Sequence, residues 1–337
     1  MTDATPYKLY GAIGSPYSMK IRAYLRYRHL PHLWLHGAKY QGESREHVKV
    51  PVIPIMQYPD GSWHNDSTPM IFDLEGRLDA GRGVLPVDAG DAFLAFLLED
   101  FGDEWLTKAM FHYRWFYERD QAQMSKYLAF DAMAGGGLET IQNFADNFRA
   151  RQVGRTPLVG VTAENAPLIE ASTRQICALF EAHVVDQHYL FGTRPSIAEF
   201  GLYGQMSQWG VDPTAADMMR ADYPFTYRWL EHVSDMSGVT GEWRKADDTL
   251  PAIVPGLLKL VGTIYMPFLI ANQKALEAGK DHFAFEAMGM PYSQGTFKYQ
   301  VKCLSELRKA YAALPASARQ RIAPLLEEAG CLSTLKG

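Results

Sequence analysis

Residues 50–67 read VPVIPIMQYPDGSWHNDS, and this stretch decides the predicted fold. Residues 50–58 and 62–64 are predicted as two strands, because the Pro-Asp-Gly between them is typical of a hairpin turn. A helix is predicted over residues 68–78, with Ser67 as its N-cap. The stretch therefore predicts two antiparallel strands followed directly by a helix.

Upstream of this stretch, strand and helix patterns alternate. Residues 7–13 and 32–36 are predicted as strands, and residues 16–28 as a helix with Met19 and Ala23 on one face. Strand, helix and strand, followed by strand, strand and helix, predict a small mixed sheet covered by helices.

Downstream, residues 80–90 (AGRGVLPVDAG) are rich in Gly and Pro and are predicted as a linker between domains. Beyond them the strand pattern disappears and helical periodicity begins, interrupted by Gly at each of residues 135–137. The predicted helices cover residues 92–126, 166–185, 197–208, 225–236, 256–278, 298–313 and 316–329. This part of the chain is therefore expected to be all-helical, with a more mixed tail.

Composition limits the classes of function. A formal net charge of −5 argues against a general nucleic-acid binder, which needs a basic face. Three dispersed cysteines, Cys177, Cys303 and Cys331, are too few for a disulfide scaffold or a four-ligand zinc site. We therefore expect a reducing compartment. The opening residues MTDATPYKLY show no pattern of a secretory signal.

Residues 253–271 are apolar enough to raise the question of a membrane span. They contain Pro255, Lys259, Gly262 and Pro267, and their number is at the lower edge of what a bilayer requires. We expect a buried helix, kinked near Pro267, and no membrane partner.

Two motifs carry more specific information. Ser15-Pro16-Tyr17-Ser18 follows an apolar run, and Ile53-Pro54 lies upstream of Asp66-Ser67. Together they resemble the glutathione site of the glutathione S-transferase family, in which a cis-proline precedes an acidic residue by a set interval. That interval selects Pro54 over Pro51.

The resemblance covers about two-thirds of the chain, residues 6–80 and 91–240. It implies a thioredoxin-like α/β glutathione-binding domain at residues 1–82 and an all-α helical-bundle substrate domain at residues 91–240. A mostly helical C-terminal extension, residues 241–337, is expected to pack on the helical domain and to help close the pocket of the second substrate.

The resemblance also implies roles for the motif residues. Pro54 would be cis, and Ile53 would offer its backbone N–H and C=O to the cysteinyl part of glutathione. Ser67 would bind the γ-glutamyl carboxylate with its hydroxyl and with the unpaired N–H groups of a helix N-terminus. Asp66 would bind the γ-glutamyl ammonium. Without the resemblance, Asp-Ser before a helix is a plain N-cap pair.

Ser15 is predicted to activate the glutathione thiol, whose pKa is expected near ~8.5 in solution. Lowering that pKa by about two units requires roughly 2.7 kcal/mol. A hydroxyl donated to an anion provides about 1.5–3 kcal/mol, and a helix N-terminus about 0.3–1 kcal/mol. Ser18 and Tyr10 are the alternative donors. The absence of cysteine at positions 15 and 18 argues against glutaredoxin-like thiol exchange.

The second substrate is expected in a pocket between the domains. Tyr17, Tyr113 and Trp115 are the predicted lining residues. The family's Asn-Pro-x-Gly-Lys run is replaced here by VKVPV at residues 48–52, so no motif locates the basic residue for the glycyl carboxylate. Lys39 is the predicted residue for this role.

Two other basic side chains near this run, Arg45 and Lys49, are alternatives to Lys39. Each of the three is a solvated surface charge in the ordinary case.

Acidic residues cluster at the predicted start of the helical domain. Glu99 and Asp103, like Asp100 and Glu104, are spaced as surface i,i+4 pairs, so we expect packing and ion pairs rather than a metal site. Further along, residues 196–199 have the spacing of a capping box, which is a folding feature.

The predicted function is activation of the glutathione thiolate for attack on an electrophilic, largely apolar small molecule, with glutathione as co-substrate and no metal. The alternative is a non-catalytic glutathione- or ligand-binding protein that retains the transferase fold. A cytoplasmic location is expected, and the resemblance suggests a homodimer.

Overall fold

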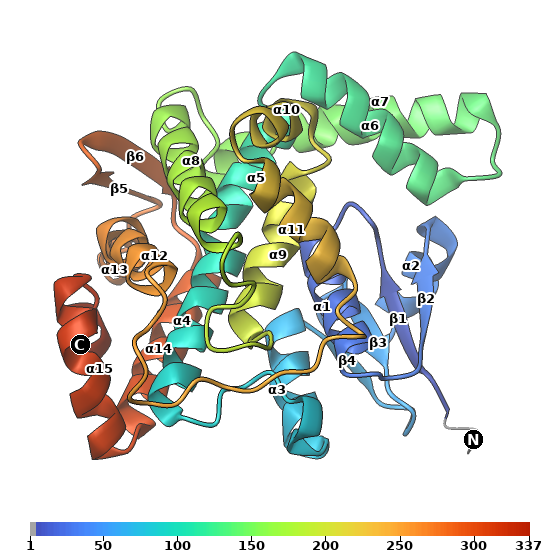
Figure 1. Cartoon of the computed structure of the whole chain (residues 1–337). Helices are drawn as coiled ribbons and strands as arrows, with labels where there is room; N and C mark the ends of the chain where they lie inside the picture. The colour runs from blue at the N-terminus through green and yellow to red at the C-terminus, as the bar shows by residue number, and fades with distance from the viewer. Residues whose placement is uncertain (1–4) are drawn as a thin grey trace.

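The computed structural model describes residues 5–337. The first four residues, which belong to the segment predicted to lack a secretory signal and to the predicted domain 1–82, lie outside the described residues. A four-stranded sheet with its helices lies at one side of the molecule, and the helical remainder extends away from it (Figure 1).

The sheet has the strand order β2-β1-β3-β4. Its strands are β1 (Tyr7–Gly11), β2 (His32–His36), β3 (Ile55–Gln57) and β4 (Trp63–Asn65). β1 pairs parallel to β2 and antiparallel to β3, with Tyr10 opposite Ile55. The helices of this part are α1 (Pro16–Tyr27), α2 (Ala38–Arg45) and α3 (Ser67–Arg77). The predicted thioredoxin-like fold is confirmed.

The hairpin predicted from residues 50–67 is present, but its strands are shorter than expected. Residues 50–54 approach the sheet without joining it. The prediction that Ser67 is the N-cap of the next helix is wrong by one residue. Asp66 occupies the cap position with φ 73°, and Ser67 is the first helical residue. The shift matters because it leaves the Ser67 hydroxyl available for another partner.

Eight helices follow a 3₁₀ turn at Ala80–Arg82. They are α4 (Ala89–Glu104), α5 (Leu106–Trp115), α6 (Glu118–Met133), α7 (Leu138–Val153), α8 (Ala166–His183), α9 (Ile197–Trp209), α10 (Pro213–Asp222) and α11 (Pro224–Ser234). The break predicted at residues 135–137 is confirmed, since it separates α6 from α7. The sequence analysis did not predict α7 and α10.

Helix α9 is the centre of the helical part and packs against α1, α4 and α5. Its capping box is confirmed, because Ser196 Oγ accepts the Ala198 N–H and the Glu199 carboxylate accepts the Ser196 N–H at 2.8 Å. Close approach of α1 requires glycine in α9. A Cβ at Gly204 would lie 2.9 Å from the carbonyl oxygen of Pro16.

The C-terminal extension contains more helices and a hairpin. The elements are α12 (Ile253–Leu260), a π-helical segment (Val261–Tyr265), α13 (Met266–Glu277), β5 (His282–Ala287), β6 (Met290–Gly295), α14 (Lys298–Ala313), α15 (Ala316–Glu328) and α16 (Leu332–Lys336). The predicted helices are confirmed, but the hairpin was not foreseen. Its turn residues Met288 and Gly289 have φ of 54° and 70°, a conformation that Asn-Gly signals far more clearly than Met-Gly does.

One continuous helical stretch, Ile253–Glu277, is long and apolar enough to cross a membrane by length and composition alone. Most of it is buried inside the protein, as predicted. Its π-helical segment ends directly before Met266 and Pro267, and the predicted kink near Pro267 stays a prediction.

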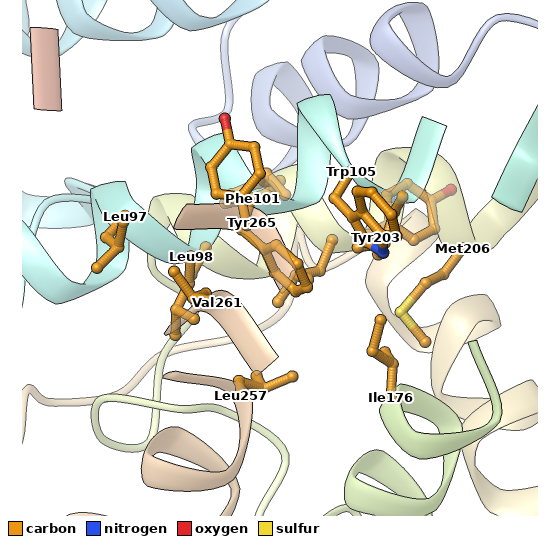
Figure 2. Close-up of a cluster of buried hydrophobic side chains, with 14 of the residues drawn as sticks. Leu97, Leu98, Phe101, Trp105, Ile176, Tyr203, Met206, Leu257, Val261 and Tyr265 are labelled. Atoms are coloured by element: carbon orange, nitrogen blue, oxygen red, sulfur yellow. The ribbon is translucent and has the colours of Figure 1, made fainter. Parts of the chain in front are cut away.

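The extension and the helical part share one hydrophobic core. Figure 2 shows Leu97, Leu98 and Phe101 of α4 facing Leu257, Val261 and Tyr265 of the extension. Trp105, Ile176, Tyr203 and Met206 continue the same cluster. The extension thus packs against the helical part through this cluster.

Candidate functional site

The segment before β3 has the backbone that the resemblance predicts. The Ile53–Pro54 peptide bond is cis, and Pro54 is buried while Ile53 is partly exposed. Ile53 and Pro54 both line a cavity of about 630 Å³. The two central residues of the predicted glutathione site thus reach one cavity.

Three walls enclose this cavity. The first comes from the N-terminal domain, with residues 50–54 and 65–67 and Tyr17 of α1. The second comes from Asp103, Glu104, Thr107 and Lys108 of α4 and α5, together with residues 158–159. The third comes from the extension, with Gln294, Phe297, Tyr299, Gln300 and Lys302. The expectation that the extension helps close the pocket is supported, since it forms one complete wall.

The wall from the extension is held in place by one buried side chain of α13. Asn272 is fully buried, accepts the Phe297 N–H at 2.8 Å and donates its amide to the Phe297 carbonyl oxygen at 2.9 Å. Both backbone groups of the residue before α14 are therefore fixed. This positions the start of α14 over the cavity.

Asp66 and Ser67 lie in the first wall, at the N-terminus of α3. Ser67 is 2% exposed, and its buried Oγ has no hydrogen-bond partner within residues 5–337. A buried hydroxyl without a partner costs about 1–3 kcal/mol, so such a group marks a place where a ligand or water binds. Asp66 accepts a hydrogen bond from the Tyr299 hydroxyl at 2.9 Å.

Ser15 is the N-cap of α1, as its position before Pro16 suggests. Its Oγ accepts the Ser18 N–H at 3.3 Å, and its own hydroxyl hydrogen finds no acceptor in the described part of the chain. Ser15 is partly exposed and is not among the residues that line the cavity. Tyr17 does line the cavity and donates its hydroxyl to the Asp103 carbonyl oxygen at 3.1 Å.

The two alternative donors are more deeply buried than Ser15. Ser18 is fully buried, and its Oγ accepts the Ala12 N–H at 3.4 Å. Tyr10 is buried against Trp63, with 5.4 Å between ring centroids. Neither lines the cavity.

The predicted positions of Tyr113 and Trp115 in the second-substrate pocket are wrong. They are 3% and 1% exposed and belong to the helical core, where Tyr113 approaches the sulfur of Met218 and Trp115 packs on Phe148. Helical periodicity indicated their helix but not the direction of its buried face.

The prediction of Lys39 as a ligand of the glycyl carboxylate is also wrong for this cavity. Lys39 is exposed on α2 beside the ring of Tyr40, and Arg45 and Lys49 do not line the cavity either. The basic side chains that do line it are Lys108 and Lys302, and no motif indicated them. Lys302 is exposed and lies near the ring of Tyr299.

Glu99 and Asp103 are not surface residues, contrary to the prediction. Glu99 is fully buried and Asp103 nearly so, and both bind the buried Lys20 of α1. Lys20 Nζ lies 2.6 Å from Asp103 Oδ2 and 2.9 Å from Thr68 Oγ1, and also contacts Glu99. Although burial opposes the charge, Asp103 and Glu99 raise the pKa of Lys20 above its ordinary value.

This cluster ties α1 and α3 of the N-terminal domain to α4 of the helical part. Within residues 5–337, no group of three or more His, Cys, Asp or Glu side chains is arranged to hold a metal ion. The acidic side chains here serve as ion-pair partners instead.

A second cavity of about 920 Å³ adjoins the first and shares Asp103, Glu104, Tyr299 and Lys302 with it. Its remaining lining is mostly apolar and comes from α3, α4 and α14, including Phe72, Phe93 and Phe96. Tyr299 and Lys302 therefore lie between the two cavities.

Comparison with known proteins identifies the first part of the chain. Residues 9–80 match the family model described as the N-terminal domain of glutathione S-transferase. A comparison with curated proteins finds no match.

Several solved structures are similar at low sequence identity. A glutathione S-transferase from Methylobacterium radiotolerans JCM 2831, in complex with glutathione sulfonate, is 17% identical; the match covers 73% of this chain and all of that one, with a TM-score of 0.43. One from Methylobacillus flagellatus KT, with glutathione bound, is 14% identical over 67% and 93% of the two chains, with a TM-score of 0.40. The Tau class enzyme of mango, Mangifera indica, is 17% identical over 70% and 91%, with a TM-score of 0.41. Residues 9–80 are therefore similar to the N-terminal domain of the glutathione S-transferase family.

Proposed function

We propose that the protein is a glutathione transferase that activates the glutathione thiol for attack on an electrophilic, largely apolar small molecule. One observation carries the proposal: in a domain similar to the glutathione S-transferase N-terminal domain, Ser67 lines a cavity and its buried hydroxyl has no partner among the described residues. Beside it in the same cavity lie Asp66 and the cis Ile53–Pro54 segment.

The chemistry of these groups suits the two ends of the γ-glutamyl unit. Ser67 Oγ and the free N–H groups in the first turn of α3 would donate to its α-carboxylate. Asp66 would accept from its ammonium group, sharing its carboxylate with the Tyr299 hydroxyl. Ile53 would pair its backbone with the cysteinyl unit, which directs the thiol toward the N-terminus of α1.

Ser15 would stabilise the thiolate. Its hydroxyl accepts a backbone N–H as N-cap while its hydrogen finds no acceptor in the described chain, so the hydrogen can be donated to sulfur. The thiolate sulfur would then form a bond to an electrophilic carbon. Either a leaving group departs with its electron pair, or the acceptor takes up the electrons and then a proton.

A sharp test compares two buried serines. Ser67→Ala should weaken glutathione binding about 10-fold or more, as expected for a hydrogen bond to a charged group, without lowering the free energy of unfolding. The matched control is Ser172→Ala. Ser172 accepts from Trp105 Nε1 at 3.2 Å and donates to the Ile169 carbonyl, so this change should lower stability and leave binding intact. Equal binding by wild type and Ser67→Ala would overturn the proposed glutathione pose.

The non-catalytic alternative is favoured by one observation, namely that Ser15 is not among the residues lining the cavity. Ultraviolet difference spectra with glutathione at neutral pH distinguish the two functions. A transferase should show thiolate absorbance, and this absorbance should be lower in Ser15→Ala. Tyr17→Phe is measured in the same way for comparison. Glutathione binding without thiolate absorbance would instead support a binding protein.

The cellular setting remains a prediction. All three cysteines are buried free thiols, which suits the expected reducing cytoplasm. The homodimer remains a prediction as well, and sedimentation analysis of the full chain would test it.

A further inference from the structure

We propose that Lys108 binds an anionic group of the second substrate, so that the preferred electrophiles are largely apolar molecules bearing a carboxylate or a similar anion. This inference rests on the proposed function and deepens it. It assigns a specificity-determining residue that neither the motifs nor the family match indicate.

The position of Lys108 carries the first step of the argument. It lies on α5, 2% exposed, in the second wall of the cavity that also contains Ser67. Ile53, which would pair with the cysteinyl unit, lines the same cavity, so an acceptor joined to the glutathione sulfur would share that space with α5. The apolar side chains Leu158, Val159 and Phe297 line the same space and would suit its uncharged part.

The surroundings of the Lys108 ammonium carry the second step. No carboxylate lies within 4.0 Å of its nitrogen in the described part of the chain, and no side chain there accepts a hydrogen bond from it. The ring of Phe268, on the extension, lies with its centroid 5.1 Å from Nζ. Burial lowers the pKa of Lys108 to about 8, with Glu104 opposing the shift.

The nearby carboxylates are already engaged elsewhere. Asp103 binds Lys20, and Glu104 accepts a hydrogen bond from the Gln300 amide at 3.4 Å. Asp100 accepts from the Tyr265 hydroxyl at 2.6 Å. The ammonium therefore lacks a close anion within the fold, which a ligand in the cavity would supply.

A buried cation of this kind needs compensation. An ammonium removed from water without an ion-pair partner is costly to the folded state, and such groups concentrate at functional sites. Gln300 adds a second unsatisfied group to the same cavity, because its buried Oε1 has no partner within residues 5–337. Polar groups of a bound ligand would satisfy both.

The experiment compares ligands that differ in one charged group. Glutathione, S-hexylglutathione and S-(5-carboxypentyl)glutathione are titrated calorimetrically into the full chain at pH 7, as wild type and as Lys108→Met. Wild type should bind the carboxylated derivative about ten-fold more tightly than the hexyl derivative, because it alone presents an anion to Lys108. Lys108→Met should lose this preference while retaining its affinity for S-hexylglutathione, which also shows that the variant is folded.

Lys302→Met is the matched control, since it removes a second, exposed lysine from the same cavity and should keep the preference. Equal affinity of wild type for the two derivatives would overturn the inference but not the proposed function. Uniform weakening of all three ligands in Lys108→Met would also overturn it, by assigning Lys108 to glutathione itself. Failure of wild type to bind any of the three would overturn the proposed function first.

Discussion

Two regions of the molecule each bury a lysine, and the two lysines differ in their surroundings. At the junction of α1 with α4, Lys20 contacts two carboxylates and a hydroxyl. In the cavity wall beyond, Lys108 has an aromatic ring and no carboxylate within ion-pair distance among the described residues. The pKa of Lys20 is raised, whereas that of Lys108 is lowered.

Lys20 is a cation whose carboxylate partners belong to the fold. Lys108 is a cation for which we propose that a ligand supplies the anion. Burial acts against both charges, but only at Lys20 do the carboxylates reverse its effect. Exposure alone does not distinguish them, because both side chains are almost completely buried. What distinguishes them is whether the anion belongs to the protein.

The largest effect is expected for Lys20→Met. Removing this cation leaves Glu99 and Asp103 buried together without compensation, so the free energy of unfolding should fall by about 3–5 kcal/mol. Urea unfolding at pH 7 measures the loss. Adding Glu99→Gln should recover part of it, and Lys49→Met, at an exposed site, should change little. A loss below about 1 kcal/mol would show that the cluster does not hold the domains together.

Lys108→Met should change the free energy of unfolding in the opposite direction. The pKa of Lys108 is lowered from 10.5 to about 8, so the charged form costs stability at pH 7, and its removal should add about 1–3 kcal/mol. Between about pH 8 and 10.5 the folded wild type releases this proton while the unfolded chain keeps it. The free energy of unfolding of wild type should therefore rise relative to that of the variant across this pH range. Above the range, the difference in stability between the two proteins should vanish.

Urea unfolding of both proteins at several pH values between 7 and 10.5 checks this sign. Lys302→Met, at an exposed lysine, is the control. Its difference in stability from wild type should not depend on pH. If Lys108→Met is destabilised throughout, the ammonium has a partner in the fold and the contrast with Lys20 fails.

A smaller effect is expected at the edge of the Lys20 cluster. Thr68 accepts from Lys20 Nζ at 2.9 Å and donates to Glu99 at 2.5 Å, so Thr68→Val removes one neutral member and keeps the charges paired. The free energy of unfolding should fall by about 1–2 kcal/mol in thermal or urea unfolding. Thr240→Val, at an exposed threonine, should be close to neutral.

The smallest effect is expected for Tyr299→Phe, which removes the hydrogen bond from the extension to Asp66. Stability should fall by about 0.5–1.5 kcal/mol, with Tyr127→Phe at an exposed site as the control. The glutathione affinity of the variant reports separately on Asp66. A rise in affinity would show that the phenol competes with the ligand ammonium, and a fall would show that it orients the carboxylate.

Much of the site was predictable because its determinants are local. The hairpin and the N-terminus of α3 follow from a turn and a cap within residues 50–67, and the cis bond at Ile53–Pro54 was implied by the family resemblance. Ser67 could be singled out for the same reason, although its position was misjudged by one residue. The elements of the first domain were predicted from local patterns, although its sheet also pairs β1 with β3, which is distant in sequence.

The residues that were misjudged depend on which face of a helix turns toward which neighbour. Tyr113 and Trp115 turned out to be core residues because they pack against α10 and α7. Glu99 and Asp103 turned out to be buried because they bind Lys20 of α1. Periodicity defines a face, but it does not say what covers it.

By itself, then, the sequence determined the N-terminal domain, its ligand segment and most helices of the chain. Tertiary structure alone decided that residues 294–302 line the cavity. It also decided that Lys20 has carboxylate partners, whereas Lys108 has none within ion-pair distance among the described residues. The reason is physical. Turns, caps and X–Pro bonds act over a few residues, whereas the charge state of a buried lysine depends on side chains that only folding brings near it.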